Sequence, residues 1–178
     1  MRLPLLCLAT ILVFAATAFG AKPESTGPDP DVILKSLYKE HEAQKGPFAD
    51  TKNRAVLARY FTDELVGLII KDAVASDGEV GAIEFDPLYE SQDPVITNFK
   101  VGKVNWGGIL KRDGDEPEDG LAVVEVTFKD SGKSRSIGFR FHQDAKKAWK
   151  IADINYSDGS TMVGLLRGDG AGPESGAD

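Results

Sequence analysis

The spacing of apolar residues changes near the middle of the chain, and this change constrains the fold more than any other feature. Between residues 31 and 76, apolar side chains recur every three or four positions, which is typical of helices with one buried face. From residue 95 onward they recur at every second position, which is typical of strands with one buried face. Helices followed by a sheet predict an α+β domain.

The first pattern predicts three amphipathic helices, at about residues 31–44, 53–61 and 63–76. Thr62 is the expected N-cap of the third helix, because its hydroxyl can accept a hydrogen bond from a backbone N–H of the first turn. Asp63 and Glu64 follow it, where carboxylates suit the positive end of the helix dipole. The apolar residues in 78–94 follow no regular spacing, so we expect an irregular connection there, with room for one helical turn after Pro87.

The second pattern predicts four strands joined as an antiparallel meander. Its alternation slips by one position at Gly102 and again at Ala152 or Asp153. A β-bulge, which is one extra residue in a strand, explains such a slip. Two bulges are expected to bend the sheet and to leave a concave pocket against the helices. An acidic hairpin loop is expected at residues 113–120, and a short closing helix at 161–166.

The first twenty residues predict a secretory signal peptide. Arg2 precedes an apolar run that extends to Phe19 and is too short to span a bilayer alone, and small residues follow it. We expect cleavage near Ala18 or Gly20, and therefore a periplasmic or secreted protein. The one cysteine, Cys7, lies in this segment, so the mature chain is expected to have no disulfide and no thiolate zinc ligand.

The remaining residues predict a single domain, from 31 to 167, between two irregular ends. Residues 21–30 are rich in Pro and polar residues and predict a flexible leader. Residues 168–178 contain no large apolar side chain and predict a disordered acidic tail. The formal net charge of −7 opposes general binding to nucleic acid or to an anionic membrane surface, and no stable membrane anchor is expected.

Motifs for cofactors and metals are absent from the sequence. The mature chain has no phosphate-binding loop, no dinucleotide glycine pattern and no nucleophile elbow. The acidic residues at 113–119 do not have the spacing of a calcium-binding loop. We therefore expect no cofactor, no bound metal and no recognisable set of catalytic residues.

Several short motifs distinguish the chain from an arbitrary α+β domain. It carries Arg-Tyr-Phe-Thr-x-Glu-Leu at 59–65, Gly-x-x-x-Phe-Asp-Pro-Leu at 81–88, Gln-Asp at 92–93 and Trp-Lys-Ile-x-Asp-Ile at 149–154. These residues resemble a bacterial domain of unknown function, family number 3828, and the wider nuclear-transport-factor-2-like superfamily. The resemblance covers nearly all of the predicted domain. It implies an exported protein with a cone-shaped, cystatin-like fold, and it implies no activity.

The candidate ligand-binding residues lie mainly on the irregular connection. The resemblance places Asp86, Tyr89, Gln92 and Asp93 at the mouth of the cone, where polar groups would meet an aromatic-lined cavity. The alternative is structural: each aspartate would accept hydrogen bonds from nearby backbone N–H groups and so brace the loop.

Tyr60 and Trp106 complete the candidate set. Tyr60 or Tyr38 could polarise a substrate if an aspartate of the connection acted as a base, and strand parity places Trp106 in the core or in a cavity wall. The two histidines are expected to have other roles, with His41 packed on the apolar stripe of the first helix and His142 on a solvated strand edge. Two histidines so far apart form no recognisable metal site.

Three functions are compatible with these patterns. The favoured interpretation is a soluble, non-enzymatic exported binding module for an unidentified small molecule, an envelope fragment or a partner protein. The second is a small cavity enzyme, a hydrolase or isomerase, that uses an Asp/Tyr pair. The third is a structural homodimer with its sheet in the interface.

Overall fold

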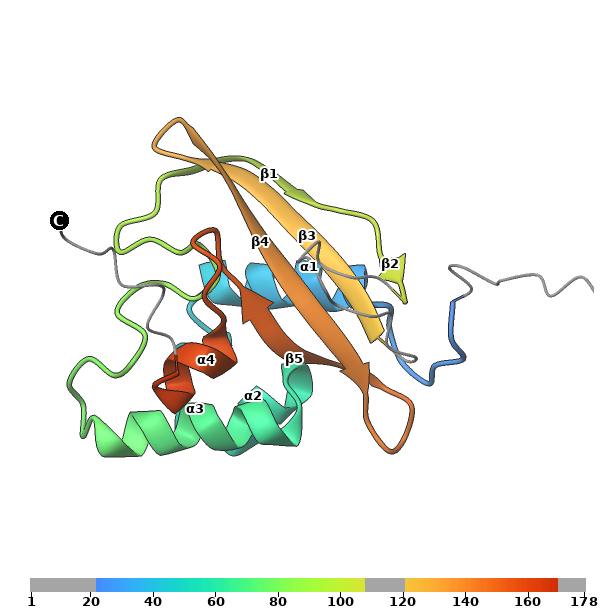
Figure 1. Ribbon diagram of the computed structural model, residues 1–178, viewed down its shortest axis with the longest axis horizontal. Helices are drawn as coiled ribbons and strands as arrows, with labels where there is room; N and C mark the ends of the chain where they lie inside the picture. Colours follow the sequence, from blue (N-terminus) through green and yellow to red (C-terminus); the bar gives the residue numbers. More distant parts are fainter. Residues whose placement is uncertain (1–21, 108–120, 170–178) are drawn as a thin grey trace, which may run out of the picture.

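Helices and strands occupy separate stretches of the chain, as the change in spacing predicts. The computed structural model describes residues 22–107 and 121–169 (Figure 1). Its elements are α1 (Pro30–Glu42), α2 (Arg54–Tyr60), α3 (Asp63–Ala75), β1 (Ile96–Val101), β2 (Asn105–Trp106), β3 (Leu121–Asp130), β4 (Lys133–Gln143), β5 (Trp149–Asn155) and α4 (Met162–Arg167). The predicted α+β class is confirmed. The predicted signal peptide, the acidic loop at 113–120 and the tail from residue 170 lie outside the described residues.

The helix starts follow from polar side chains at the N-cap positions. Thr62 caps α3 as predicted, and its Oγ1 accepts a hydrogen bond from the Leu65 N–H at 3.4 Å. Asn53 caps α2 in the same way, since its Oδ1 accepts from the Val56 N–H at 3.3 Å. Such a cap satisfies a backbone donor that has no partner within the helix.

The strands form one antiparallel sheet in the order β1-β3-β4-β5, and β2 also pairs with β3. β1 and β2 both pair with β3, and each later strand pairs with the one before it, which confirms the predicted meander. The long β3–β4 hairpin reverses at Ser131 and Gly132, where φ is 49° and 82°. Positive φ at both central residues is the geometry of the tight hairpin turn whose twist matches that of paired strands.

Both predicted slips in the alternation are confirmed as register shifts. Ala152 is the extra residue of β5, because Arg140 pairs with Asp153 and Phe141 pairs with Ile151. The first shift lies between β1 and β2 and includes Gly102, whose N–H donates to the Glu125 carbonyl at 2.8 Å.

A third irregularity was not predicted. Within β1 the register also shifts between Thr97 and Lys100, and Asn98 between them has a φ of 54°. The alternation predicts Val95 and Phe99 on the inward face of this strand. Val95 is instead exposed, whereas the Phe99 ring, although 39% exposed, lies 4.7 Å from that of the buried Tyr38 between centroids.

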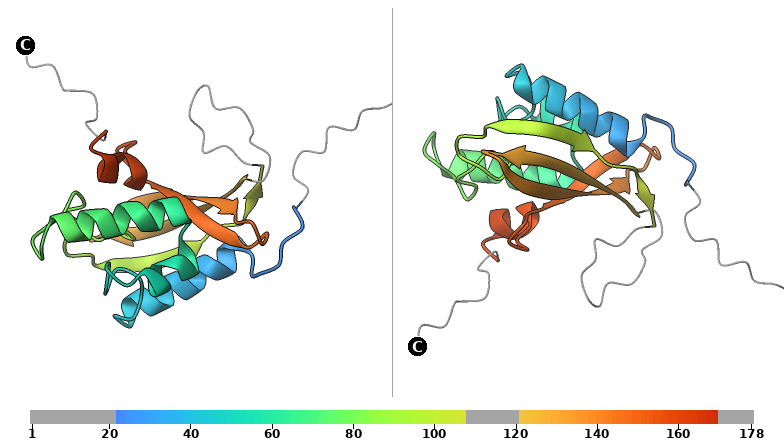
Figure 2. Two further views of the ribbon diagram at one scale, coloured as in Figure 1. Left: turned by 90° about the horizontal axis from the view of Figure 1, so that it is seen from below. Right: turned by 90° about the horizontal axis from the view of Figure 1, so that it is seen from above.

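The helices pack against the apolar face of the sheet. α1 contacts β1 and β3, whereas α2, α3 and α4 contact β5. Figures 1 and 2 show α1 along the β1–β3 part of the sheet and α3 below β5. The inward residues predicted for the strands are buried in one shared core, among them Val124, Val126, Ile137, Phe139, Phe141, Ile151 and Ile154.

Aromatic side chains fill the core between α1 and the sheet, where the bent sheet was expected to leave a pocket. The Tyr38 ring lies 6.1 Å from that of Phe139 and 5.5 Å from that of Tyr89, measured between centroids. The Tyr89 ring lies 5.5 Å from that of Phe128. The cavity described below is lined by none of these aromatic residues.

Residues 22–29, which precede α1, are irregular and joined to the end of β4 and the β4–β5 turn. The Gln143 side chain donates to the Glu24 carbonyl at 2.7 Å, and the Thr26 N–H donates to the Lys147 carbonyl at 3.1 Å. The segment predicted as a flexible leader thus makes hydrogen bonds to the sheet in this structure.

Candidate functional site

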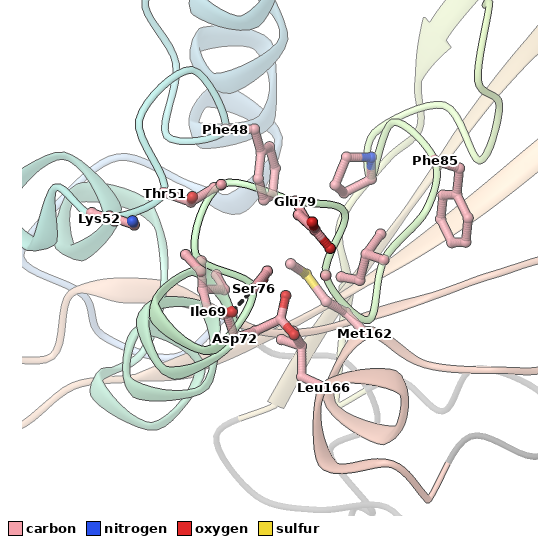
Figure 3. Close-up of a pocket in the computed structure, with 15 residues that line it drawn as sticks. Phe48, Thr51, Lys52, Ile69, Asp72, Ser76, Glu79, Phe85, Met162 and Leu166 are labelled. Atoms are coloured by element: carbon pink, nitrogen blue, oxygen red, sulfur yellow. Dashed lines mark hydrogen bonds between the residues drawn. The ribbon is translucent and has the colours of Figure 1, made fainter.

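A cavity of about 380 Å³ opens beside α3, between the α1–α2 connection, the loop at 78–87 and α4 (Figure 3). Its apolar wall is formed mainly by Phe48, Ile69, Ile83, Phe85, Met162 and Leu166. Its polar groups come from Thr51, Lys52, Asp72, Ser76 and Glu79. Residues from three separate stretches of the chain, at 48–52, 69–87 and 162–166, therefore meet around one space.

The loop at 78–87 is attached to α3 through Asp72. The Asp72 Oδ1 atom accepts a hydrogen bond from the Ala82 N–H at 3.0 Å. A Cβ atom on Gly81 would lie 2.1 Å from Asp72 Oδ2, so a larger residue there would displace the Asp72 carboxylate. The chain leaves α3 through Asp77 and Gly78, which have φ of 47° and 92°. These contacts fix the loop as one side of the cavity.

The polar side chains face the same space from opposite sides. In Figure 3 the carboxylates of Asp72 on α3 and Glu79 on the loop both point into the cavity, above Met162 and Leu166. The Ser76 hydroxyl is already engaged, because it donates to the Asp72 carbonyl (Figure 3). An apolar wall with a few polar groups at its rim is typical of sites that bind small molecules, and the volume lies at the lower end of their range.

Asp86, the first of the predicted site residues, has a structural role and an unpredicted partner. Its Oδ1 atom accepts from the Leu88 N–H at 2.9 Å, which confirms the alternative that this aspartate braces the loop. Its Oδ2 atom lies 2.7 Å from His41 Nε2. The prediction that His41 only packs on the apolar stripe therefore missed an ionisable partner.

Two tyrosines lie beside this pair. The Tyr38 hydroxyl donates to the Leu88 carbonyl at 2.8 Å, and the Tyr89 ring lies 5.9 Å from the His41 ring. Burial raises the pKa of Tyr89 to about 12 and raises that of Tyr38 well above its ordinary value. Both phenols are therefore protonated at neutral pH, and each can donate a hydrogen bond but cannot serve as a base.

Of the other predicted residues, Gln92 and Asp93 directly follow Ser91, whose carbonyl accepts from the Asp86 N–H at 2.9 Å, whereas Tyr60 and Trp106 lie on α2 and β2. Asp93 and Gln92 are exposed, and the Gln92 side chain donates to the Glu84 carbonyl at 3.3 Å. The Tyr60 hydroxyl lies 3.3 Å from the Ser36 hydroxyl. Trp106 packs against Trp149 at 5.5 Å between ring centroids.

The six candidates thus do not form one site, and none of them lines the cavity. The prediction of Asp86 identified the correct region but not the correct residue, because its two neighbours, Phe85 and Pro87, line the cavity. The wall residues on α3 and α4 carry no motif, since they recur with the ordinary spacing of a helix.

Within residues 22–107 and 121–169, no three side chains of His, Cys, Asp or Glu lie close enough together to hold a metal ion. Over the same part of the chain, no helix has both the length and the hydrophobicity needed to cross a lipid bilayer.

No protein-family model and no curated protein matches the chain. Among solved structures, the chain is similar to the phospholipid-binding protein from Ralstonia solanacearum, determined in complex with a phospholipid. The two are 21% identical, the match covers 79% of this chain and 74% of the other, and the TM-score is 0.33. The resemblance to the nuclear-transport-factor-2-like superfamily stays a prediction.

Proposed function

We propose that this protein is an exported binding module that holds a small amphipathic molecule in the cavity beside α3. The observation that carries the proposal is the cavity itself, about 380 Å³ in volume, with an apolar wall and a polar rim. Sites for small molecules combine these two features, because the wall supplies affinity and the polar groups supply orientation.

The apolar part of the ligand would lie against Phe48, Met162 and Leu166. Each methylene buried there contributes about 0.8 kcal/mol, so affinity is expected to increase with the length of an alkyl chain until the cavity is full. The polar part would remain at the rim, within reach of Lys52, Asp72 and Glu79, and close to solvent.

A catalytic role has less support. Asp86, which lies in the chain between two residues of the cavity wall, is held by the Leu88 N–H and by His41. Tyr60 has a raised pKa, mainly because of burial, and lies outside the cavity wall. A base and a polarising hydroxyl are therefore not directed at a common space.

A homodimer formed through the outer face of the sheet also has less support. Arg140 and His142 lie on this face, opposite in parity to the buried Phe141. An interface there would have to bury these side chains, and burial of a charge without a partner is costly.

The signal-like segment at residues 1–20 supports the proposal of export. The protein should be recovered from the periplasm or the medium with a new N-terminus at Phe19 or Ala21, as read by mass spectrometry of the intact protein. Recovery of the uncleaved chain from the cytoplasm alone would contradict export and would leave the cavity proposal untouched.

The binding proposal is tested with 1-N-phenylnaphthylamine, a dye whose emission rises in apolar surroundings. Decanol, decanoate and decylamine, which share one chain and differ in head group, are then used as competitors. Ala73→Phe fills the cavity from α3, whereas Ala75→Phe places the same side chain at an exposed position of the same helix outside the cavity wall.

We expect the wild type and Ala75→Phe to bind the dye, at least one competitor to displace it, and Ala73→Phe to bind at least about tenfold more weakly. Equal binding by the two variants, or no binding by the wild type, contradicts the proposal. Far-UV circular dichroism of both variants verifies that they are folded.

A further inference from the structure

A second hollow, about 650 Å³ and more open than the first, lies between the start of α1 and the β1–β2 segment. It shares no residue with the cavity beside α3. Four lysines line it, namely Lys22, Lys35, Lys100 and Lys103. We call this hollow the lysine groove.

The lysine groove has an excess of positive charge. Lys22 is paired with Asp29 at 2.6 Å, and Lys35 is paired with Asp31 at 2.8 Å. Lys100 and Lys103 are exposed, and no ion pair with either occurs among the described residues. Among the described residues that line the groove, four lysines and two aspartates leave an excess of two positive charges, in a chain whose net charge is −7.

The floor of the lysine groove is apolar. Trp106, Val101 and Val104 line it, and each is half-buried. The Trp106 ring rests on the buried Trp149, and Lys22 Nζ lies 5.8 Å from the Trp106 ring centroid. A ligand in the groove would therefore meet both ammonium groups and an aromatic surface.

We propose that the lysine groove binds an extended acidic peptide segment of a partner protein. Carboxylates at intervals along the segment would pair with Lys100 and Lys103, and an apolar side chain between them would pack on Trp106. Exposed ion pairs such as Lys22–Asp29 contribute little to stability, so Lys22 can exchange Asp29 for a carboxylate of the peptide. The proposal is independent of the small-molecule cavity.

Other polyanions fit the groove less well. Nucleic acid is bound by several phosphate contacts at once, and a chain with a net charge of −7 repels a long polyanion outside the groove itself. A flat membrane surface cannot enter a hollow whose aromatic floor is half-buried. A short acidic peptide avoids both difficulties, and opposite charges on the two partners would speed their association.

Tryptophan fluorescence provides the test. The chain has two tryptophans, and Trp149 is only 2% exposed, so a change in emission on binding is expected to come mainly from Trp106. The probe is the peptide Glu-Glu-Leu-Glu-Glu-Leu-Glu-Glu, and its counterpart with lysine in place of glutamate is the control. Anionic phosphatidylglycerol vesicles and a single-stranded oligothymidine are titrated in parallel.

The variants are Lys100→Glu/Lys103→Glu in the groove and Lys71→Glu/Lys133→Glu at exposed positions elsewhere, which change the net charge equally. Of the four probes, we expect only the acidic peptide to bind. Its affinity should fall roughly tenfold or more in the groove variant and should be unchanged in the control variant. Raising the salt from about 0.05 M to about 0.5 M should weaken the binding.

Equal losses in the two variants, no binding by the wild type at low salt, or tighter binding of the vesicles or the oligonucleotide would each overturn the proposal. All four substituted lysines are exposed, so both variants should fold. If the groove variant does not, Lys100→Gln/Lys103→Gln replaces it with the same expectation and the same contrary outcomes.

Discussion

His41 Nε2 on α1 lies 2.7 Å from Asp86 Oδ2 on the connection that precedes the sheet. The two side chains are 14% and 20% exposed. Asp86 also accepts the Leu88 N–H, so one carboxylate fixes the turn and ties it to the first helix. Positions 41 and 86 are thereby joined near the C-terminal end of α1.

Removal of this carboxylate should destabilise the fold. Asp86→Ala leaves both the Leu88 N–H and the His41 ring without their acceptor, and a lost partner at a half-buried site costs about 1–3 kcal/mol. The free energy of unfolding in urea measures it. Asp93→Ala, at an exposed position of the same connection, is the control and should change it by less than about 0.5 kcal/mol.

The contact between the two residues can be separated from their other interactions by a double-mutant cycle. If the contact stabilises the fold, the loss in His41→Ala/Asp86→Ala will be smaller than the sum of the two single losses. Additive losses would show that Asp86 acts through the Leu88 N–H alone.

The four tyrosines should titrate at higher pH in the folded protein than in the unfolded chain. Burial raises the pKa of Tyr38, Tyr60 and Tyr156, and raises that of Tyr89 from 10.0 to about 12. Because the folded-state pKa values are raised, the stability they confer is complete below about pH 10 and is lost as the pH rises further.

Absorbance at 295 nm, which reports tyrosinate, measures this shift. Near pH 10.5 the folded protein should show far less tyrosinate than the same protein in urea. Coincident titration curves would contradict the burial of these phenols. The melting temperature should fall over the same range of pH.

Substitution by alanine should have opposite effects on stability at two glycines. At Gly102 a Cβ atom would lie 2.7 Å from the Glu125 carbonyl oxygen, which is fixed backbone of β3. Gly102→Ala should therefore destabilise the fold by about 1–3 kcal/mol. At Gly67, inside α3, a Cβ atom would meet nothing within 4 Å, and alanine should stabilise the helix by about 0.5–1 kcal/mol.

Thermal or urea unfolding of the two variants measures both changes. If Gly102→Ala were as stable as the wild type, this would contradict the close approach of the Glu125 carbonyl to Gly102. A loss of stability in Gly67→Ala would contradict the open space around Gly67.

Elements with one buried face could be predicted from the sequence, because their apolar residues repeat with the period of the element. The slips at Gly102 and Ala152 were visible for the same reason: each moves the buried side chains to the other parity. The irregularity at Asn98 was not visible. It lies in an edge strand with mostly exposed side chains, where a change of register leaves no mark on the hydrophobic pattern.

The candidate site was less predictable, because it depends on contacts between distant segments. Asp86 and Tyr89 stood out as polar residues on an irregular connection, but nothing in the sequence relates position 86 to His41. The cavity wall combines Phe48, Met162 and the α3 residues, which are ordinary apolar positions in their own elements. Their meeting in space is set by how the helices pack on the sheet.

Met162 offers the most direct test of a ligand in the cavity. The chain has two methionines, Met1 and Met162, and Met162 is buried in the cavity wall. Protein labelled with ¹³C at the methionine methyl groups is titrated with decanol, decanoate or decylamine below their micelle concentrations, in the wild type and in Ala73→Phe.

We predict that the Met162 methyl resonance of the wild type shifts to saturation with at least one of these compounds, and shows a nuclear Overhauser effect to its alkyl chain. The Ala73→Phe resonance should not move. An unshifted Met162 methyl group in the wild type, up to the solubility of all three compounds, would contradict a small-molecule site beside α3.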